Sequence, residues 1–231
     1  MTLLLTSDLN GKYHWYEWLV RNAHRVDAIC VAGDLTDPFR GEIRAQRELA
    51  ELAAWRLGGS RADFFACEGD QDLWGSRWFW LKSLAGTRRA GKVTVTCVPW
   101  KCEDPAWFEN PSRWSREAAN CWIVLQHEPP SGTTVGAGAA AELLGDSLAM
   151  KFAPDFLLAG HMRCAPWLAD GSWWDRRGRT FVFNAGFDPA SAFPCHILLD
   201  TVRREAIWRH ARGHERIRLD AFSAPFSSTH P

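Results

Sequence analysis

Nine short apolar runs of β type constrain the fold of this chain more than any other feature. They are Leu3–Thr6, Ala28–Ala32, Phe64–Cys67, Val93–Val98, Trp122–Leu125, Phe156–Ala159, Thr180–Phe183, His196–Leu199 and Glu205–Trp208. In the first half of the chain, segments with helical spacing separate these runs, which is typical of parallel α/β units. The second half is richer in strands, so we expect antiparallel pairing among the last ones.

Three segments are predicted to be helical. Trp15–Ala23 has apolar spacing suited to one helix face, and Gly41–Leu57 is the clearest helix, which Gly58-Gly59 should end. The apolar side of this second helix is predicted to comprise Leu49, Leu52, Ala53 and Leu57. Ala137–Met150, rich in Ala and Leu, is the third.

Turn signals and composition predict one domain. Asp170-Gly171 predicts a hairpin and Arg177-Gly178 a turn. No linker and no repeat divides the chain, so we expect a single domain over residues 1–220 and a loose, Ser- and Pro-rich tail at residues 221–231. At 231 residues the chain is long enough for a sizeable core.

Charge and cysteine usage exclude several classes of protein. The 27 basic and 27 acidic residues balance, so nothing indicates nucleic acid or an anionic membrane as partner. No apolar run approaches the ~20 residues that span a bilayer, and the N-terminal run lacks the features of a signal peptide. The seven cysteines contain no C-x-x-C pair, which favours reduced thiols. We therefore expect a cytoplasmic protein, with Cys164 as a small buried thiol.

Polar residues follow five of the apolar runs at the point where each predicted strand ends. They are Asp8, Asp34, Asp70, His127 and His161. Strand ends that meet at one edge of a sheet gather such side chains into one pocket. Gathered carboxylates repel one another unless a cation lies among them. A mixture of carboxylate and imidazole ligands suits Mn²⁺, Fe²⁺ or Zn²⁺.

The ordered set resembles the calcineurin-like metallophosphoesterase family, whose pattern runs D-x-H, G-D-x-x-D, G-N-H-[DE], a lone H, and G-H-x-H. The corresponding blocks here are Asp8-Leu9-Asn10, Gly33-Asp34-Leu35-Thr36-Asp37, Gly69-Asp70-Gln71-Asp72, His127, and Gly160-His161-Met162-Arg163. The loops His127-Glu128-Pro129-Pro130 and Asn184-Ala185-Gly186 also resemble those of small bacterial-type members. The resemblance covers about residues 1–210.

The resemblance implies a four-layer αββα sandwich of two mixed β-sheets flanked by helices. It also implies two divalent metals bridged by an aspartate, which Asp34 matches, and hydrolysis of a phosphomonoester or phosphodiester by a metal-activated water. The substrate would be a small phosphoester or a nucleotide-like molecule. Mapped onto this chain, one metal site would use Asp34, Asp70, His127 and His161. The other would use Asp8, Asn10, Asp34 and residue 163.

Four positions depart from the family pattern. Asp70 replaces an asparagine and can still ligate, with an added negative charge that should tighten metal binding. Asn10 and Arg163 replace histidines, and arginine cannot ligate because it stays protonated. Gln71 replaces the catalytic histidine and is no general acid. We therefore expect one tight metal site and a weak or absent second one.

The altered charges suggest a compensation. We expect the Arg163 guanidinium to lie near Asp8 and to take over part of the missing metal's role, because a buried carboxylate needs a cation. Asp34, Gln71 and Arg163 are the predicted catalytic residues, with Gln71 and Arg163 contacting phosphate. Asp72 loses its usual role of orienting the histidine at position 71.

Two interpretations of the site stay open. In one, the protein is a working phosphoesterase that is slowed by its altered residues. In the other, it is a catalytically retired protein of the same fold that binds a phosphate ligand or acts as a regulatory module. The 14 tryptophans can serve as core and loop packing or as an aromatic wall that stacks on a base. A third class of function is an interaction protein whose binding surface is built from such tryptophans. His14, His196 and Asp37 are expected to lie outside the ligand set.

Overall fold

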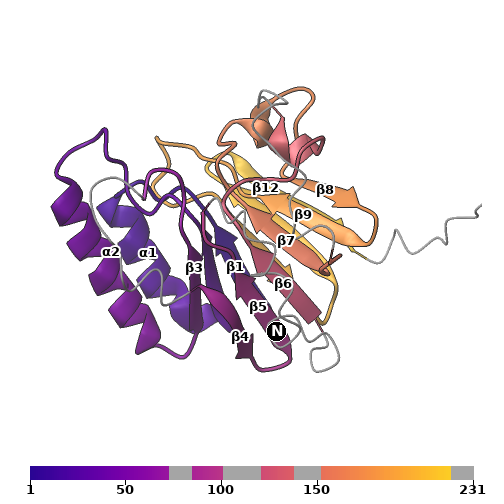
Figure 1. Cartoon of the computed structure of the whole chain (residues 1–231), viewed down its shortest axis with the longest axis horizontal. Coiled ribbons are helices and arrows are strands. Elements are labelled where there is room, and N and C mark those ends of the chain that lie inside the picture. The colour runs from indigo at the N-terminus through magenta and orange to yellow at the C-terminus, as the bar shows by residue number, and fades with distance from the viewer. Residues whose placement is uncertain (73–84, 101–120, 138–151, 220–231) are drawn as a thin grey trace, which may run out of the picture.

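A computed structural model describes residues 1–72, 85–100, 121–137 and 152–219 of the chain (Figure 1). Two six-stranded sheets and two α-helices form the described part. The helices are α1 (Tyr13–Asn22) and α2 (Ile43–Gly58). The short 3₁₀ segments are η1 (Ala23–Arg25), η3 (Thr134–Gly136) and η4 (Ala165–Trp167). None of the described helices is long and apolar enough to cross a membrane.

The first sheet has the strand order β12-β11-β10-β1-β2-β3. Its strands are β1 (Thr2–Thr6), β2 (Ala28–Ala32), β3 (Asp63–Cys67), β10 (His196–Asp200), β11 (Glu205–His210) and β12 (Gly213–Arg218). β1, β2 and β3 are parallel, while β10 pairs with β1 in the antiparallel direction and continues into the antiparallel strands β11 and β12. The antiparallel pairing predicted for the last strands is confirmed.

The second sheet has the strand order β4-β5-β6-β7-β9-β8. Its strands are β4 (Gly86–Ala90), β5 (Val93–Cys97), β6 (Cys121–Leu125), β7 (Phe156–Ala159), β8 (Trp174–Arg177) and β9 (Thr180–Asn184). The four central strands are parallel, and the two edge strands are antiparallel to their neighbours. Both sheets are therefore mixed, as predicted.

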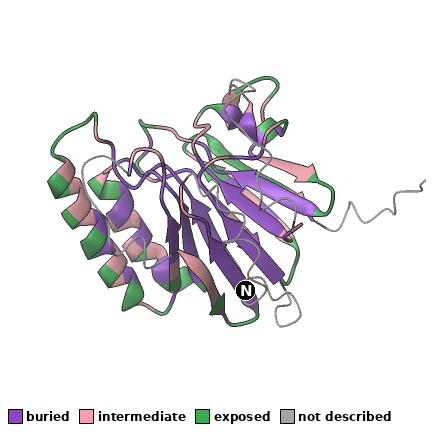
Figure 2. Cartoon of the chain, in the orientation of Figure 1, coloured by how far each residue is buried: buried purple, intermediate pink, exposed green. Residues whose placement is uncertain are grey.

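Alternating side chains of the strands point to two different cores, which explains why β1 and β2 are apolar along their whole length. Leu3, Leu5 and Cys30 belong to the core between the sheets, together with Val95 and Ile123 of the second sheet. The intervening side chains pack against the helices. This second core comprises Leu4, Ile29 and Val31 with Trp15 and Leu19 of α1 and Ala53 and Leu57 of α2. Figure 2 shows the buried layers between the helices and the sheets.

The α/β fold of two mixed sheets with helices is thus confirmed, whereas two of its predicted parts lie outside the described residues. These are the helix predicted over Ala137–Met150 and the tail at residues 221–231. In the helix predicted over Gly41–Leu57, Leu52 is 52% exposed, so its place on the apolar side was wrong. Ala50 lies on the buried side instead.

Three strands were missed, and each lies at the edge of its sheet: β4, β8 and β12. Their sequences are rich in Arg and other polar residues, which is typical of edge strands and hides them from a search for apolar runs. The hairpin between β8 and β9 turns at Gly178, whose φ is +58°. Asp170-Gly171 does not form a hairpin, because the 3₁₀ segment η4 and not a strand precedes it.

The described cysteines are all free, and five of the six are buried. Burial raises the pKa of Cys30 and Cys67 well above the ordinary value of a thiol, so these groups stay protonated and unreactive. Cys164 is exposed, so the expectation of a buried thiol at that position was wrong.

Candidate metal centre

The loops that follow five strands meet at one edge of the two sheets. The strands are β1, β2 and β3 of the first sheet and β6 and β7 of the second, and their loops carry Asp8, Asp34, Asp70, His127 and His161. Backbone hydrogen bonds join these loops directly. Asp8 N donates to Gly33 O over 3.0 Å, and Gly160 N donates to His127 O over 2.9 Å. The structure therefore brings all five predicted residues to one place.

The backbone at this edge is strained. Of the six non-glycine residues with positive φ in the described chain, four belong to the predicted site. They are Asp8 (55°), Asn10 (49°), Asp34 (52°) and His161 (62°). Such a conformation costs an L-residue about 1–2 kcal/mol. Strain concentrated in four residues of one pocket indicates that their positions matter for function.

Two glycines allow the loops to approach one another closely. A Cβ atom on Gly69 would overlap the carboxylate and the backbone nitrogen of Asp34, and one on Gly33 would overlap the His127 ring. Gly33 also has a φ of +77°, which favours glycine. These positions therefore let the Asp34 carboxylate and the His127 imidazole pack against neighbouring backbone.

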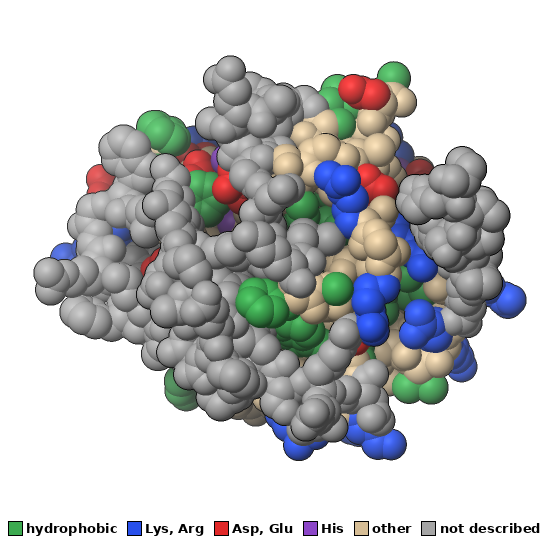
Figure 3. All heavy atoms as spheres, turned by 45° about the vertical axis from the view of Figure 1, so that its right-hand side comes forward, with side chains coloured by type: hydrophobic (Ala, Val, Ile, Leu, Met, Phe, Trp, Pro, Cys, Tyr) green, Lys and Arg blue, Asp and Glu red, His purple; other side chains and the backbone are tan. Residues whose placement is uncertain are grey.

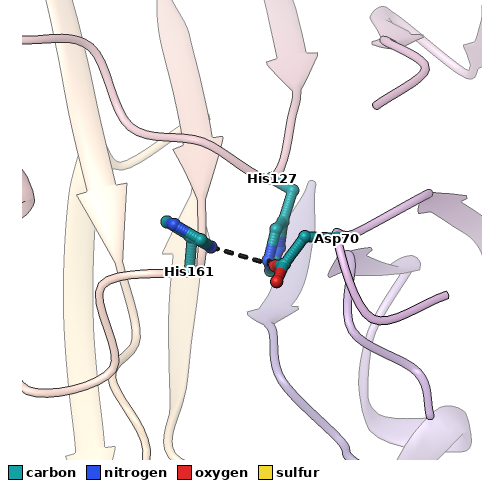
Figure 4. Close-up of side chains that lie close together, drawn as sticks. All are labelled: Asp70, His127 and His161. Carbon is teal, nitrogen blue, oxygen red and sulfur yellow. Dashed lines mark hydrogen bonds and ion pairs between the residues drawn. The ribbon is translucent and has the colours of Figure 1, made fainter. Parts of the chain in front are cut away.

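Asp70, His127 and His161 form a cluster of potential metal ligands that we call the histidine half (Figure 4). Asp70 Oδ1 lies 3.1 Å from His127 Nε2 and 3.0 Å from His161 Nδ1. One ligand atom from each residue lies within 4.8 Å of the other two. These donors therefore point toward a common centre from three different loops.

His127 shows that the histidine half fits a cation. Its Nδ1 lies 2.7 Å from Ala32 O, which can only accept, so Nδ1 carries the hydrogen. In the neutral ring, the lone pair of Nε2 would then face Asp70 Oδ1 at 3.1 Å and Asp34 Oδ1 at 3.3 Å. Three acceptors can converge in this way only around a proton or a metal ion. Burial alone would lower the pKa of His127, but Asp34 and Asp70 outweigh it and raise the pKa well above its ordinary value.

The histidine half is open to solvent on one side. The side chains of His161 and Asp70 are 27% and 37% exposed, whereas that of His127 is completely buried. Figure 3 shows small patches of histidine beside acidic side chains, between segments drawn in grey. A ligand could therefore approach from the side of His161 and Asp70.

Trp100 packs against this half and was missed from the sequence. Its ring centroid lies 5.4 Å from that of His127 and 5.7 Å from that of His161. The residue is half-buried and follows β5, outside every motif block. No local signal distinguishes it from the other tryptophans, because its position depends on contacts between distant loops.

Arg163 occupies the other side of the site, which we call the arginine half. Its Nε donates to Asp8 Oδ1 over 2.9 Å, and its Nη2 donates to Asn10 Oδ1 over 2.9 Å and to Asp34 Oδ2 over 2.8 Å. The predicted proximity of Arg163 and Asp8 is confirmed. Burial opposes the charged form of Arg163, but Asp8 and Asp34 outweigh it and raise its pKa.

The buried carboxylate of Asp8 explains why a cation is needed in this half. Asp8 is fully buried, and its Oδ2 has no hydrogen-bond partner among the described residues. Burial raises the pKa of this carboxyl, and the nearby Asp34 carboxylate adds to the effect, whereas the positive charges of His127 and Arg163 lower it. The guanidinium therefore favours the ionised form of a group that burial disfavours.

Asp34 connects the two halves. Its Oδ1 lies beside His127 Nε2 and accepts a hydrogen bond from Gln71 N over 3.0 Å, while its Oδ2 accepts from Arg163. Gln71 thus contacts the site through its backbone. Its side-chain Oε1 is buried without a hydrogen-bond partner in the described part of the chain, so its contact with phosphate stays a prediction.

Asp72 fastens the two acidic loops to each other, a function that sequence reasoning missed. Its carboxylate accepts from Leu35 N, Thr36 N and Thr36 Oγ1 of the loop after β2, and from Gly69 N of the loop after β3. Burial and the neighbouring Asp34 raise its pKa to about 7 against the effect of these donors. The residue stands in a motif block, but its partners are mostly backbone groups that no pattern reveals.

Three residues that the sequence places outside the ligand set also lie outside both clusters of potential metal ligands in the described residues. His14 is exposed, and its Nε2 lies 3.4 Å from Ser191 O. His196 is buried, with Nδ1 2.9 Å from Pro194 O. Asp37 is buried in the loop after β2, where it accepts a hydrogen bond from a backbone N–H.

Comparisons with known proteins agree with this geometry. The sequence model of the calcineurin-like phosphoesterase family matches residues 1–163, a range that includes every residue of the histidine half and of the arginine half. No curated protein matches the sequence.

Solved structures of low sequence identity share the fold. A dimetal phosphatase from Danio rerio is 10% identical with a TM-score of 0.64, and the match covers 94% of this chain and 97% of that one. The protein TT1561 of Thermus thermophilus is 17% identical with a TM-score of 0.55, covering 94% and 98% of the two chains. A purple acid phosphatase from yellow lupin (Lupinus luteus) seeds is 11% identical with a TM-score of 0.54, covering 95% of this chain and 52% of that one.

Proposed function

Because the chain belongs to the calcineurin-like phosphoesterase family, we propose that it hydrolyses a phosphoester with one tightly held divalent metal ion. The proposed ligands are Asp34, Asp70, His127 and His161. The observation that carries this proposal is the convergence of acceptor atoms on the histidine half, with His127 Nε2 facing two carboxylate oxygens. Mn²⁺, Fe²⁺ and Zn²⁺ all suit this donor set.

When bound, a divalent ion lowers the pKa of a water toward neutrality and balances charge on phosphoryl oxygens. The chain's own residues prepare the place for it. The carbonyl of Ala32 fixes the tautomer and orientation of His127. Trp100 packs on both histidine rings, and Asp72 holds the loops of Asp34 and Asp70 together. Arg163 and Gln71 are proposed to contact the phosphoryl group.

Gln71 limits the substrates that the site can use. Its amide can donate a hydrogen bond but cannot protonate a leaving oxygen, and the loss of a general acid typically costs about 10²–10⁴-fold in rate. Esters whose leaving groups depart without a proton are therefore the proposed substrates, with aryl phosphoesters as the practical representatives. We propose that the protein acts in the cytoplasm, which the free cysteines of the described residues favour.

A second candidate function is binding without turnover. The replacement of the family's catalytic histidine by Gln71, and of a ligand histidine by Arg163, favours a retired enzyme that binds a phosphate group. In that case the pocket would hold phosphate through Arg163 and release it unchanged, as a regulatory module would.

Hydrolysis of p-nitrophenyl phosphate and bis-p-nitrophenyl phosphate with added Mn²⁺ separates the two candidates. The full chain is expected to hydrolyse at least one of them and to contain about one metal ion per chain by elemental analysis. Asp34→Ala should abolish both properties, and Asp170→Ala, at an exposed position, should change neither. Metal or phosphate binding without turnover would support the retired enzyme. Activity that survives in Asp34→Ala would be contamination, and a chain that binds no metal would contradict the proposal.

A further inference from the structure

The three hydrogen-bond acceptors of Arg163 are the three residues that the family pattern assigns to a second metal ion. They are Asp8, Asn10 and Asp34, at 2.8–2.9 Å from the guanidinium. We infer that Arg163 is the permanent second cation of this centre, bound by the residues that would otherwise ligate a metal. The inference rests on the proposed function, because it describes the other half of the same site.

The guanidinium fits this place by geometry and by charge. Nε donates to one carboxylate, and the two N–H groups of Nη2 donate to a second carboxylate and to an amide oxygen. Each acceptor therefore receives its own N–H from the planar fork. Asp8 and Asp34 are 0% and 1% exposed at the side chain, and two carboxylates so buried require a nearby positive charge. A metal ion in the same place would have to displace a cation that is part of the chain.

Contacts to the loop of Arg163 and to its side chain restrict the position of the guanidinium. Phe187 N donates to Arg163 O over 3.1 Å, and the Phe187 ring lies 5.3 Å from the guanidinium carbon. Asn184 Nδ2 donates to Met162 O over 2.9 Å, which ties the same loop to the end of β9. These contacts restrict the long side chain before any ligand arrives, so less entropy is lost than for a free arginine.

One edge of the guanidinium is left for a ligand. Nε and Nη2 are occupied, whereas Nη1 makes no hydrogen bond to the described residues, and the side chain is 28% exposed. Nη1 carries two N–H groups that can donate to the phosphoryl oxygens of a ligand. Arg163 therefore serves as a fixed charge toward the interior and as a phosphate donor toward the solvent.

A cation of charge +1 in place of a metal ion changes which substrates the centre favours. Asp8, Asp34 and Asp70 carry three negative charges when ionised, and Arg163 together with one divalent ion carries three positive charges. The net charge of the centre is then zero. A neutral centre discriminates less strongly in favour of a dianionic phosphomonoester than a positively charged one does, because Coulomb attraction scales with both charges. The centre is thus suited to a phosphodiester, which carries a single negative charge.

Metal stoichiometry tests the inference. The full chain, Arg163→His and Asn10→His/Arg163→His would each be titrated with Mn²⁺, and bound metal counted by equilibrium dialysis and elemental analysis. Electron paramagnetic resonance would report spin coupling between adjacent Mn²⁺ ions. Arg203→His is the matched control, because Arg203 is 82% exposed and loses the same charge. We expect one ion in the native chain and in the control, and two coupled ions in the double variant.

The outcomes separate this inference from the proposed function. Two ions in the native chain would overturn the inference, and so would a double variant that folds and still binds one. No ion in the native chain would contradict the proposed function instead. If the histidine variants fail to fold, Arg163→Lys provides the second measurement. Lysine has the charge but not the fork, so the variant should keep a single metal and lose affinity for inorganic phosphate by about tenfold or more. A second metal ion bound by this variant would overturn the inference, and unchanged phosphate affinity would overturn the role of Arg163 as a phosphate donor.

Substrate preference provides an independent measurement. We expect the ratio of kcat/KM for bis-p-nitrophenyl phosphate to that for p-nitrophenyl phosphate to fall by about tenfold or more in the double variant, because a second divalent ion makes its centre positive. The ratio cancels any general loss of activity. A ratio that stays unchanged while two ions bind would overturn the charge argument.

Discussion

The two halves of the site are built from the same kind of loop but meet the same electrostatic need in different ways. In the histidine half, Asp70 Oδ1 and two imidazole nitrogens face a common centre, where the positive charge must come from a bound ion or a proton. In the arginine half, Asp8 and Asp34 face a guanidinium that belongs to the chain. Buried carboxylates need a cation, but the fold does not require that the cation be a metal.

The difference between the halves predicts which one the native fold depends on. A cation that is covalently part of the chain is present from the moment the protein folds, whereas a metal ion stabilises only in proportion to its concentration and affinity. We therefore expect the arginine half to contribute more than the histidine half to the stability of the metal-free protein, and the histidine half to gain the most stability when metal is added. Substitutions in and around each half can test this contrast.

Arg163→Met should produce the largest loss of stability. The substitution keeps an unbranched side chain but removes the cation from two buried carboxylates, and breaking a buried pair in this way costs about 3–5 kcal/mol. The free energy of unfolding would be measured by urea denaturation in the presence of a chelator. Arg179→Met is the control, since Arg179 pairs with Asp155 at the surface and is 55% exposed. Equal losses in the two variants would show that the arginine half has no special role.

Asp72→Ala should produce the second largest loss of stability, because Asp72 joins the two acidic loops. Removing its carboxylate leaves four donors in the interior without their partner, which we expect to cost roughly 2–4 kcal/mol. Affinity for Mn²⁺ should fall about 10–100-fold as well, as is typical when a group that supports metal ligands is lost. Urea denaturation and metal titration would measure the two effects.

Asp72→Asn distinguishes positioning from simple packing. The amide has nearly the same volume and keeps one acceptor oxygen, so it should recover part of the metal affinity that Asp72→Ala loses. If the two variants bind metal equally weakly, or if both bind as tightly as the native chain, Asp72 does not position the loops.

The sequence predicted the composition of the site better than its internal contacts. The loops after parallel strands had to meet at one edge, so the ends of β1, β2 and β3 placed Asp8, Asp34 and Asp70 together. The pairing of Arg163 with Asp8 followed from charge compensation between distant motif blocks. Both inferences depend on chemistry that is visible in the residues themselves.

The contacts that sequence reasoning missed depend on tertiary packing. Trp100 lies against His127 and His161 because three loops converge there, and an indole carries no signature of its neighbours. Asp72 binds backbone N–H groups, which almost every residue supplies. The edge strands β4, β8 and β12 escaped because pairing along one side leaves their exposed positions free to be polar.

Two buried histidines, His127 in the histidine half and His196 outside the site, have pKa values that shift in opposite directions. Carboxylates raise the pKa of His127, whereas at His196 burial outweighs the hydrogen bond to Pro194 O. Burial lowers the pKa of His196 to about 4. The unfolded chain therefore binds more protons at this residue than the folded chain between about pH 6.5 and 4, and stability falls as the pH falls through that range.

Stability measured at about pH 7 and about pH 5 should show this contribution. With an ordinary histidine pKa of about 6.5 in the unfolded chain, His196 should account for about 2 kcal/mol of the loss between these values. His196→Gln removes the titrating group, so the difference between the two pH values should shrink by about that amount in the variant. A pH dependence that is identical in the native chain and in His196→Gln would contradict the assignment of a buried, neutral imidazole.

Asp70→Asn should have the smallest effect and bears directly on the histidine half. The substitution restores the residue of the family pattern and keeps an oxygen in place of Oδ1, but it removes one negative charge from the proposed metal ligands. We expect affinity for Mn²⁺ to fall about tenfold, or about 1.4 kcal/mol. Asp170→Asn, at an exposed position, is the matched control for the change in charge. If Asp70→Asn binds Mn²⁺ as tightly as the native chain, the negative charge of Asp70 does not strengthen metal binding. The role of that charge would then be to pair with a protonated His127.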